Sequence, residues 1–164
     1  MPILDPRTLE FFSRSPEQTR RLGARLGSLL QASDLICLSG DLGAGKTTFV
    51  QGIAQGWGSL DSVSSPTFVL VNEYRRPDGR HLYHLDAYRL ANWIEAEDLD
   101  IDRMIESGPV VIEWPERIKE ALPENCLWID LSWVADEQRE MRFSGKGERY
   151  KQMVLEFRKR VFGG

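Results

Sequence analysis

Residues 40–47 read Gly-Asp-Leu-Gly-Ala-Gly-Lys-Thr, the pattern of a phosphate-binding loop. This loop directly follows the apolar run Leu35–Leu38, which is typical of a strand inside a covered parallel sheet. Apolar residues at helical spacing come next, from Phe49 to Trp57, and Gly56 and Gly58 are expected to end that helix. A glycine-rich turn without a ligand would share part of this pattern, but strand, loop and helix in this order favour an α/β fold that binds nucleotide.

Each residue type in the loop has a chemical role. Gly40, Gly43 and Gly45 can adopt left-handed torsions, which lets the N–H groups of the loop and of the next helix converge on an anion. Lys46 would bring an ammonium to the outer phosphates, and the Thr47 hydroxyl would complete the coordination of a magnesium ion. The predicted nucleotide-binding residues of this segment are Gly40, Asp41, Leu42, Gly43, Ala44, Gly45, Lys46, Thr47 and Thr48.

The length of 164 residues predicts a single domain, residues 1–164, with a core of its own. No stretch approaches the roughly 20 apolar residues of a membrane span, and residues 1–6 lack the basic and apolar regions of a secretory signal. Cys37 and Cys126 lie in apolar runs and are expected to be buried free thiols. These features together predict a cytoplasmic protein that does not contact a membrane.

The net charge of −4 argues against a protein that binds nucleic acid by itself, because such proteins normally carry a basic surface. Lysine and arginine nevertheless accumulate between Lys146 and Arg160. Two interpretations are open: a solvated helix face whose cations complement the helix dipole, or a contact with RNA or with an acidic partner.

The rest of the chain mixes helical and strand patterns. Ser15–Gln18 has a serine cap, a proline at the first helical position and a glutamine three residues after the cap, which predicts a helix start. Phe68–Tyr74 and Arg80–Asp86 flank Pro77-Asp78-Gly79 and predict a hairpin. The predicted fold is therefore an α/β sandwich of the P-loop NTPase type, with a mixed parallel and antiparallel sheet flanked by helices. The other predicted elements are a helix from about Trp93 to Ile105, strands at Val110–Ile112, Leu127–Trp133 and Met141–Ser144, and a final helix with Tyr150, Met153, Val154, Phe157 and Val161 on one face.

A phosphate loop needs a second acidic group to place magnesium and the attacking water. In open α/β sheets, ligands collect at the carboxyl ends of the strands. Glu113 directly follows the apolar strand Val110–Ile112, and Asp86 closes the second strand of the hairpin. Both are candidates for catalysis and for metal binding. The alternatives are a carboxylate at a surface strand end for Glu113 and a turn residue for Asp86.

Three further groups of residues bear on the prediction of the site. Ser64–Thr67 lies between the helix after the loop and the hairpin, where a segment that senses nucleotide state would be placed, although a plain turn fits equally well. His81 and His84 have no cysteine or histidine at metal-ligand spacing, so we expect both to be structural. The five tryptophans are scattered, which favours core and rim positions over a base-stacking surface.

Four motifs occur together and in order: Gly40–Thr48, Ser65–Thr67, His84–Leu90 (His-Leu-Asp-Ala-Tyr-Arg-Leu) and Glu113–Glu116 (Glu-Trp-Pro-Glu). Their combination resembles the TsaE (YjeE) family, the small bacterial ATPases of threonylcarbamoyladenosine tRNA modification. The resemblance covers nearly the whole chain, and the combination is far more specific than the loop alone. It implies ATP and Mg²⁺ as ligands, and ATP hydrolysis that supports the transfer of a threonylcarbamoyl group to adenosine 37 of tRNAs that read ANN codons.

The resemblance also implies partners. Members of the family do not perform the transfer themselves. They bind a heterodimer of two related actin-like-fold proteins, TsaB and TsaD, so contact with tRNA is expected to be indirect. Hydrolysis is expected to be slow for the chain alone and faster in the complex.

Site roles follow from the resemblance residue by residue. It assigns phosphate binding to Lys46 and magnesium binding to Thr47 and Glu113. Asp86 would be required for hydrolysis, by positioning either the metal or the water, and Thr67 would report nucleotide state. The residues that match those around the base are Glu17, Thr19 and Arg139.

One position departs from the family pattern. The acidic helix of the family is usually followed by a glycine, where this chain has Leu99-Asp100-Ile101. The backbone after Glu97-Asp98 is therefore open to more than one shape, whereas the nucleotide site is unaffected.

Other classes of function compete with this prediction. A small-molecule kinase of the P-loop type would need an arginine-rich lid, whereas the basic cluster is C-terminal and the acidic segment Glu95–Asp98 would make a poor lid. A GTP switch protein would normally carry an Asn-Lys-x-Asp element, which the sequence lacks. A nucleotide-dependent assembly factor that hydrolyses ATP too slowly to matter differs from the leading prediction only in rate.

Overall fold

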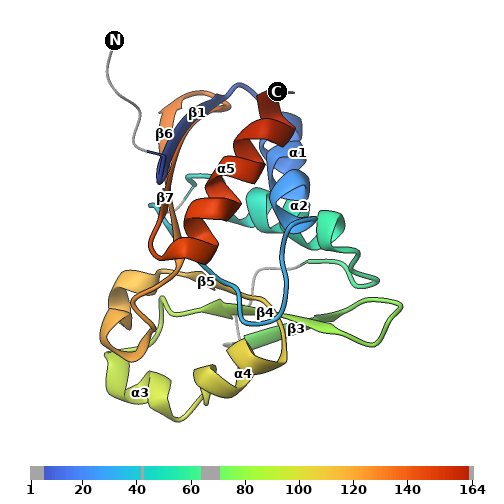
Figure 1. Cartoon of the computed structure of the whole chain (residues 1–164). Coiled ribbons are helices and arrows are strands. Elements are labelled where there is room, and N and C mark those ends of the chain that lie inside the picture. Colours follow the sequence, from blue (N-terminus) through green and yellow to red (C-terminus); the bar gives the residue numbers. More distant parts are fainter. Residues whose placement is uncertain (1–5, 42, 64–70, 163–164) are drawn as a thin grey trace.

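The computed structural model describes residues 6–41, 43–63 and 71–162 (Figure 1). The strands are β1 (Thr8–Ser13), β2 (Leu35–Ser39), β3 (Val71–Arg75), β4 (His81–Asp86), β5 (Val110–Glu113), β6 (Leu127–Ala135) and β7 (Gln138–Gly145). They form one seven-stranded sheet in the order β1-β7-β6-β2-β5-β4-β3. The central strands β6, β2, β5 and β4 run parallel, and antiparallel pairs lie at both edges. The predicted mixed sheet is confirmed.

Helices pack on both faces of this sheet. On one face lie α1 (Pro16–Gly27), α2 (Lys46–Trp57) and α5 (Glu148–Phe162), and on the other lie the shorter α3 (Trp93–Glu97) and α4 (Ile101–Ser107) (Figure 1). Alternate residues of β2 show the division, because successive side chains of a strand point to opposite faces. Ile36 and Leu38 join the core beneath α1, α2 and α5, whereas Leu35 and Cys37 join the core that includes α3 and α4.

The local signals for α1 and for the hairpin are confirmed. Ser15 caps α1, with its Oγ accepting from the Gln18 N–H at 3.1 Å, while the Gln18 side chain accepts from the Arg14 N–H at 2.7 Å. In the hairpin, β3 and β4 are antiparallel and Tyr74 is opposite Leu82. The first residues of the predicted hairpin strand, 68–70, lie outside the described residues.

The helix after the phosphate loop ends one residue before Gly58, which caps it with φ of 104°. The prediction that Gly56 also ends this helix is wrong, because Gly56 lies inside α2. A Cβ on Gly56 would lie 1.9 Å from the carbonyl O of Ala24 in α1, and one on Gly27 would lie 2.0 Å from the carbonyl O of Ile53. These glycines therefore let α1 and α2 pack with their backbones in direct contact.

The predicted helix from Trp93 to Ile105 is two helices, α3 and α4, separated at residues 98–100. Asp100 has φ of 54° and ψ of 54°, the left-handed conformation, and a continuous helix cannot pass through such a residue. Aspartate tolerates this conformation better than most residues because its short side chain can bond locally. Within the segment Leu99-Asp100-Ile101, Asp100 thus adopts a backbone conformation that glycine favours.

The strand β1 is missing from the sequence-based predictions. Thr8–Ser13 pairs antiparallel with β7, which starts at Gln138, earlier than the predicted Met141. β6 and β7 form a long hairpin with an irregularity between Trp133 and Ala135. Both cysteines are buried and free, as predicted.

Candidate nucleotide site

The phosphate loop connects β2 to α2, and glycines with positive φ set its backbone. The φ angles are 149° at Gly40, 82° at Gly43 and 99° at Gly45, and residues with a Cβ rarely adopt such torsions. α2 begins at Lys46 without a side-chain cap. The N–H groups of its first turn are therefore available to an external anion. Leu42 lies outside the described residues.

Lys46 is buried at the start of α2, with 5% of its surface exposed. Its Nζ donates to the carbonyl O of Gly40 and lies 3.7 Å from the centroid of the Trp114 ring. Trp114 reaches this place with φ of 59°, a rare torsion for a bulky residue. Burial lowers the pKa of the Lys46 ammonium, and Glu113 is the strongest of the carboxylates that act in the opposite direction.

The two candidate carboxylates end adjacent parallel strands. Asp86 is paired with Glu113 in the register of β4 and β5, and Glu113 with Leu38 in the register of β5 and β2. The carboxyl ends of these strands lie at the edge from which the phosphate loop leaves β2, the usual place for a ligand in this kind of sheet. Both carboxylates raise the pKa of Lys46 through space. The structure therefore brings the predicted cation and the predicted carboxylates together.

The surroundings of the two carboxylates differ. Asp86 is half-buried, and its Oδ1 accepts from the Tyr88 N–H at 2.9 Å. Burial raises the pKa of Asp86, and the Tyr88 hydrogen bond opposes this. Glu113 is 5% exposed, and its Oε2 lies 2.6 Å from Nε2 of His84. The Glu113 side chain is therefore held by another side chain, whereas Asp86 is held by the backbone.

The structure separates the two histidines that the sequence analysis treated alike. His81 is partly exposed at the start of β4, with its Nδ1 3.1 Å from Glu73. His84 is fully buried and contacts both Tyr74 and Glu113. The sequence contained a signal for this second contact. Residues two apart in a strand share a face, so His84 must lie on the same face as Asp86. Asp86 is opposite Glu113 in the sheet, which places His84 and Glu113 on one face.

The donor atoms of the site fit a magnesium ion. Thr47 supplies a hydroxyl in the first turn of α2, and Glu113 and Asp86 supply carboxylates. Among the described residues, no group of three or more His, Cys, Asp or Glu side chains could hold a metal. Mg²⁺ commonly binds through one or two carboxylates together with substrate phosphates. The donor set therefore suits a metal that arrives with a nucleotide.

Of the residues matched to the base, Arg139 lies beside the loop and Thr19 contacts the strand residue opposite Arg139. A Cβ on Gly45 would be 3.7 Å from Cγ and Nε of Arg139, and that Nε is buried without a hydrogen-bond partner in the described part of the chain. Ser13 is opposite Arg139 in the register of β1 and β7, and its Oγ lies 2.5 Å from Oγ1 of Thr19. Glu17 is exposed in the first turn of α1, and no described contact joins it to the loop.

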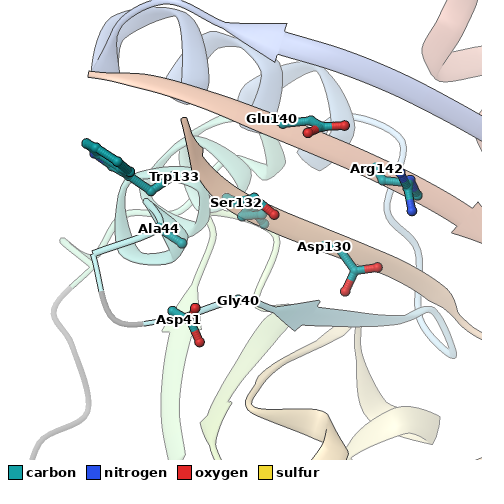
Figure 2. Close-up of a pocket in the computed structure, with 9 residues that line it drawn as sticks. Gly40, Asp41, Ala44, Asp130, Ser132, Trp133, Glu140 and Arg142 are labelled. Atoms are coloured by element: carbon teal, nitrogen blue, oxygen red, sulfur yellow. The ribbon is translucent and has the colours of Figure 1, made fainter. Parts of the chain in front are cut away.

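A cavity of about 500 Å³ lies between the loop and the hairpin of β6 and β7 (Figure 2). Lys46, Asp86 and Glu113 do not line it. The charged groups suited to the phosphates therefore lie on the β4–β5 side of the loop, and this cavity lies on the β6–β7 side. Its lining residues are Gly40, Asp41, Ala44, Asp130, Leu131, Ser132, Trp133, Glu140 and Arg142.

Two further expectations concern the nucleotide-sensing segment and the absence of a membrane span. Thr67 and the proposed sensing segment 64–67 lie outside the described residues. None of the helices in the described residues is both long enough and apolar enough to cross a membrane.

Comparisons with known proteins agree with one another. The family model described as threonylcarbamoyl adenosine biosynthesis protein TsaE matches residues 13–141. The tRNA threonylcarbamoyladenosine biosynthesis protein TsaE of Bacillus subtilis is 38% identical over 150 residues, covering 90% of this chain and 92% of the relative. The protein of the same name from Streptomyces coelicolor is 44% identical over 137 residues, covering 80% and 93%.

A solved structure agrees with these relatives. The crystal structure of Bacillus subtilis YdiB matches with a TM-score of 0.78 and 32% identity, covering 94% of this chain and 96% of that one. The matched family region, residues 13–141, contains the phosphate loop, Asp86 and Glu113 together with the strands that carry them. This chain belongs to the TsaE family.

Proposed function

We propose that this chain is a magnesium-dependent ATP hydrolase that supports the formation of threonylcarbamoyladenosine at adenosine 37 of tRNAs that read ANN codons. The pathway is supported by the relatives, which are named for threonylcarbamoyladenosine biosynthesis. Hydrolysis is supported by one observation above all. Asp86 and Glu113 stand side by side on adjacent strands, next to the lysine of a phosphate loop.

Each residue has a defined task in this proposal. The backbone N–H groups of residues 40–48 and the ammonium of Lys46 bind the phosphates. Thr47 and Glu113 hold Mg²⁺, which when bound neutralises charge on the phosphate oxygens. Asp86 positions either this metal or the attacking water.

The base is proposed to lie toward β1 and β7. Arg139 offers a buried Nε with no described partner beside Gly45. Thr19 and Glu17 remain part of this proposal, although the Thr19 hydroxyl is already engaged with Ser13. Thr67 is proposed to report nucleotide state.

The proposed partners are a TsaB-type and a TsaD-type protein, with tRNA contacted only through them, and the proposed location is the cytoplasm. ATP turnover should be slow for the chain alone, because strong stimulation of phosphoryl transfer commonly depends on a charged group supplied from elsewhere. The proposal expects the rate to rise when the partners are added.

Reconstitution tests the proposal. Purified partners, tRNA, threonine, bicarbonate and ATP are combined with and without this chain, and modified adenosine is scored over many turnovers. Sustained modification only with the chain is expected. Equal yields with and without it would reject the role in modification, and phosphorylation of a metabolite pool would instead identify a small-molecule kinase.

A further inference from the structure

The geometry points to His84 and Tyr74 as positioning residues that aim the carboxylate of Glu113 at its metal. This inference rests on the proposed function, because it deepens the metal-binding role of Glu113. It adds two residues from the β3–β4 hairpin to a site otherwise built from β2, α2, β4 and β5.

A chain of hydrogen bonds crosses three neighbouring strands. The Tyr74 hydroxyl on β3 lies 2.9 Å from Nδ1 of His84 on β4, and Nε2 of His84 lies 2.6 Å from Oε2 of Glu113 on β5. The imidazole is fully buried, and Tyr74 and Glu113 are 3% and 5% exposed. Water therefore has little access to these groups, and each bond fixes the orientation of the next side chain.

The chemistry of the three groups sets the direction of the bonds. A carboxylate only accepts, so Nε2 of His84 carries the proton that is donated to Glu113. In a neutral imidazole Nδ1 is then the acceptor, and the Tyr74 hydroxyl donates to it. Ligands of metal sites are commonly oriented by such outer hydrogen bonds.

The backbone alone does not orient the Glu113 carboxylate. The Ala87 N–H donates to the carbonyl O of Glu113 at 2.9 Å, and sheet pairing with Leu38 and Asp86 fixes its Cα. These backbone contacts leave the side-chain torsions of Glu113 free to rotate. Among the described residues, His84 is the side chain that fixes them, through its hydrogen bond to the carboxylate. Oε2 accepts from His84, and no hydrogen bond among the described residues engages Oε1, so Oε1 is the oxygen with more free lone pairs for a cation.

Two substitutions separate positioning from mere packing. In His84→Gln the side-chain amide nitrogen can take the place of Nε2 and donate to Glu113. In His84→Asn the amide is too short for this and reaches only the place of Nδ1. The other histidine of the chain provides a matched control, because His81→Gln alters a partly exposed residue of the same strand.

The test measures how Mg²⁺ tightens the binding of a fluorescent ADP analogue to the full-length chain, with parallel measurements in EDTA. His84→Asn is expected to raise the Mg²⁺ concentration for half-maximal tightening by roughly 10- to 100-fold. Affinity in EDTA should stay unchanged. His84→Gln should restore most of the Mg²⁺ response, and Tyr74→Phe should cost roughly 2- to 10-fold.

Crystal structures of the metal-free variants provide a second readout, independent of nucleotide. Glu113 should keep its side-chain torsions in His84→Gln and leave them in His84→Asn. An equal Mg²⁺ response and an unmoved Glu113 in His84→Asn would overturn the inference. If His84→Asn fails to fold, Tyr74→Phe decides by the same Mg²⁺ titration, and an unchanged response would again overturn it. A parent chain that binds no nucleotide would refute the proposed function, and the Glu113 torsions would then decide the positioning role.

Discussion

The phosphate loop and the carboxylate edge are two sides of one site, yet different interactions hold them. On the loop side the backbone dominates, with positive φ at Gly40, Gly43 and Gly45 and with α2 packed directly on α1. On the carboxylate side, side chains hold two of the three charged groups, since Glu113 accepts from His84 and Lys46 contacts Trp114, while Asp86 is held by a backbone N–H. The conformation of the loop side is determined by residues close together in the sequence. The carboxylate side forms only after strands that are distant in the sequence have paired.

This difference predicts different responses to mutation. Changes that add atoms to glycines should damage the loop side through stability. Changes that keep side-chain volume but remove a charge or a donor should damage the carboxylate side through metal binding, with stability preserved.

The largest expected effect is that of Lys46→Ala on nucleotide binding. The phosphates lose a buried cation, and removing one partner of such a charge pair costs roughly 2–5 kcal/mol. Isothermal titration with ATP and Mg²⁺ measures the loss. An unchanged affinity would contradict the assignment of the loop.

Glu113→Gln should come next, with kcat for ATP reduced roughly 100-fold or more, because a metal contributes several kcal/mol of transition-state stabilisation. Glutamine keeps the volume and can still accept from His84, so the melting temperature should stay close to that of the parent chain. Phosphate release at saturating ATP checks the rate. Normal hydrolysis would transfer the metal-binding role to Asp86.

On the loop side, Gly56→Ala should destabilise the fold by roughly 1–3 kcal/mol, because its Cβ would overlap the backbone of Ala24. The sign of the change in the free energy of unfolding distinguishes this contact from helix propensity alone. In a helix free of this contact, the same change would stabilise by about 1 kcal/mol. Urea unfolding measures the effect, with Gln55→Ala on the exposed face of α2 as the control.

The smallest expected effect concerns Asp100 in the turn between α3 and α4. Because its backbone is left-handed, Asp100→Gly should be more stable than Asp100→Ala by about 1 kcal/mol. Thermal unfolding compares the two variants. Equal stabilities would show that this turn relaxes to another conformation.

Elements with local signals were predictable from the sequence. The Ser15 cap, the Pro77-Asp78-Gly79 hairpin turn and the glycine loop each fix their structure within a few residues. Glu113 and Asp86 could be named because each stands at the end of a predicted strand, and strand ends gather at one edge of a sheet.

The remaining features depend on partners far along the chain. β1 exists because Thr8–Ser13 pairs with β7, more than a hundred residues away. The same holds for His84, whose partner Glu113 arrives on another strand. Gly56 was misread because a glycine near a helix end looks like a stop, whereas here it admits the backbone of α1.

The contact between the Lys46 ammonium and the Trp114 indole affects the free energy of ligand binding. A phosphate group that draws the ammonium away must compensate for a cation–π contact worth about 0.5–2 kcal/mol. If ATP and its product ADP bind as proposed, that amount lowers the affinity for both by a factor of roughly 2 to 30. The indole then competes with the phosphates for the Lys46 ammonium.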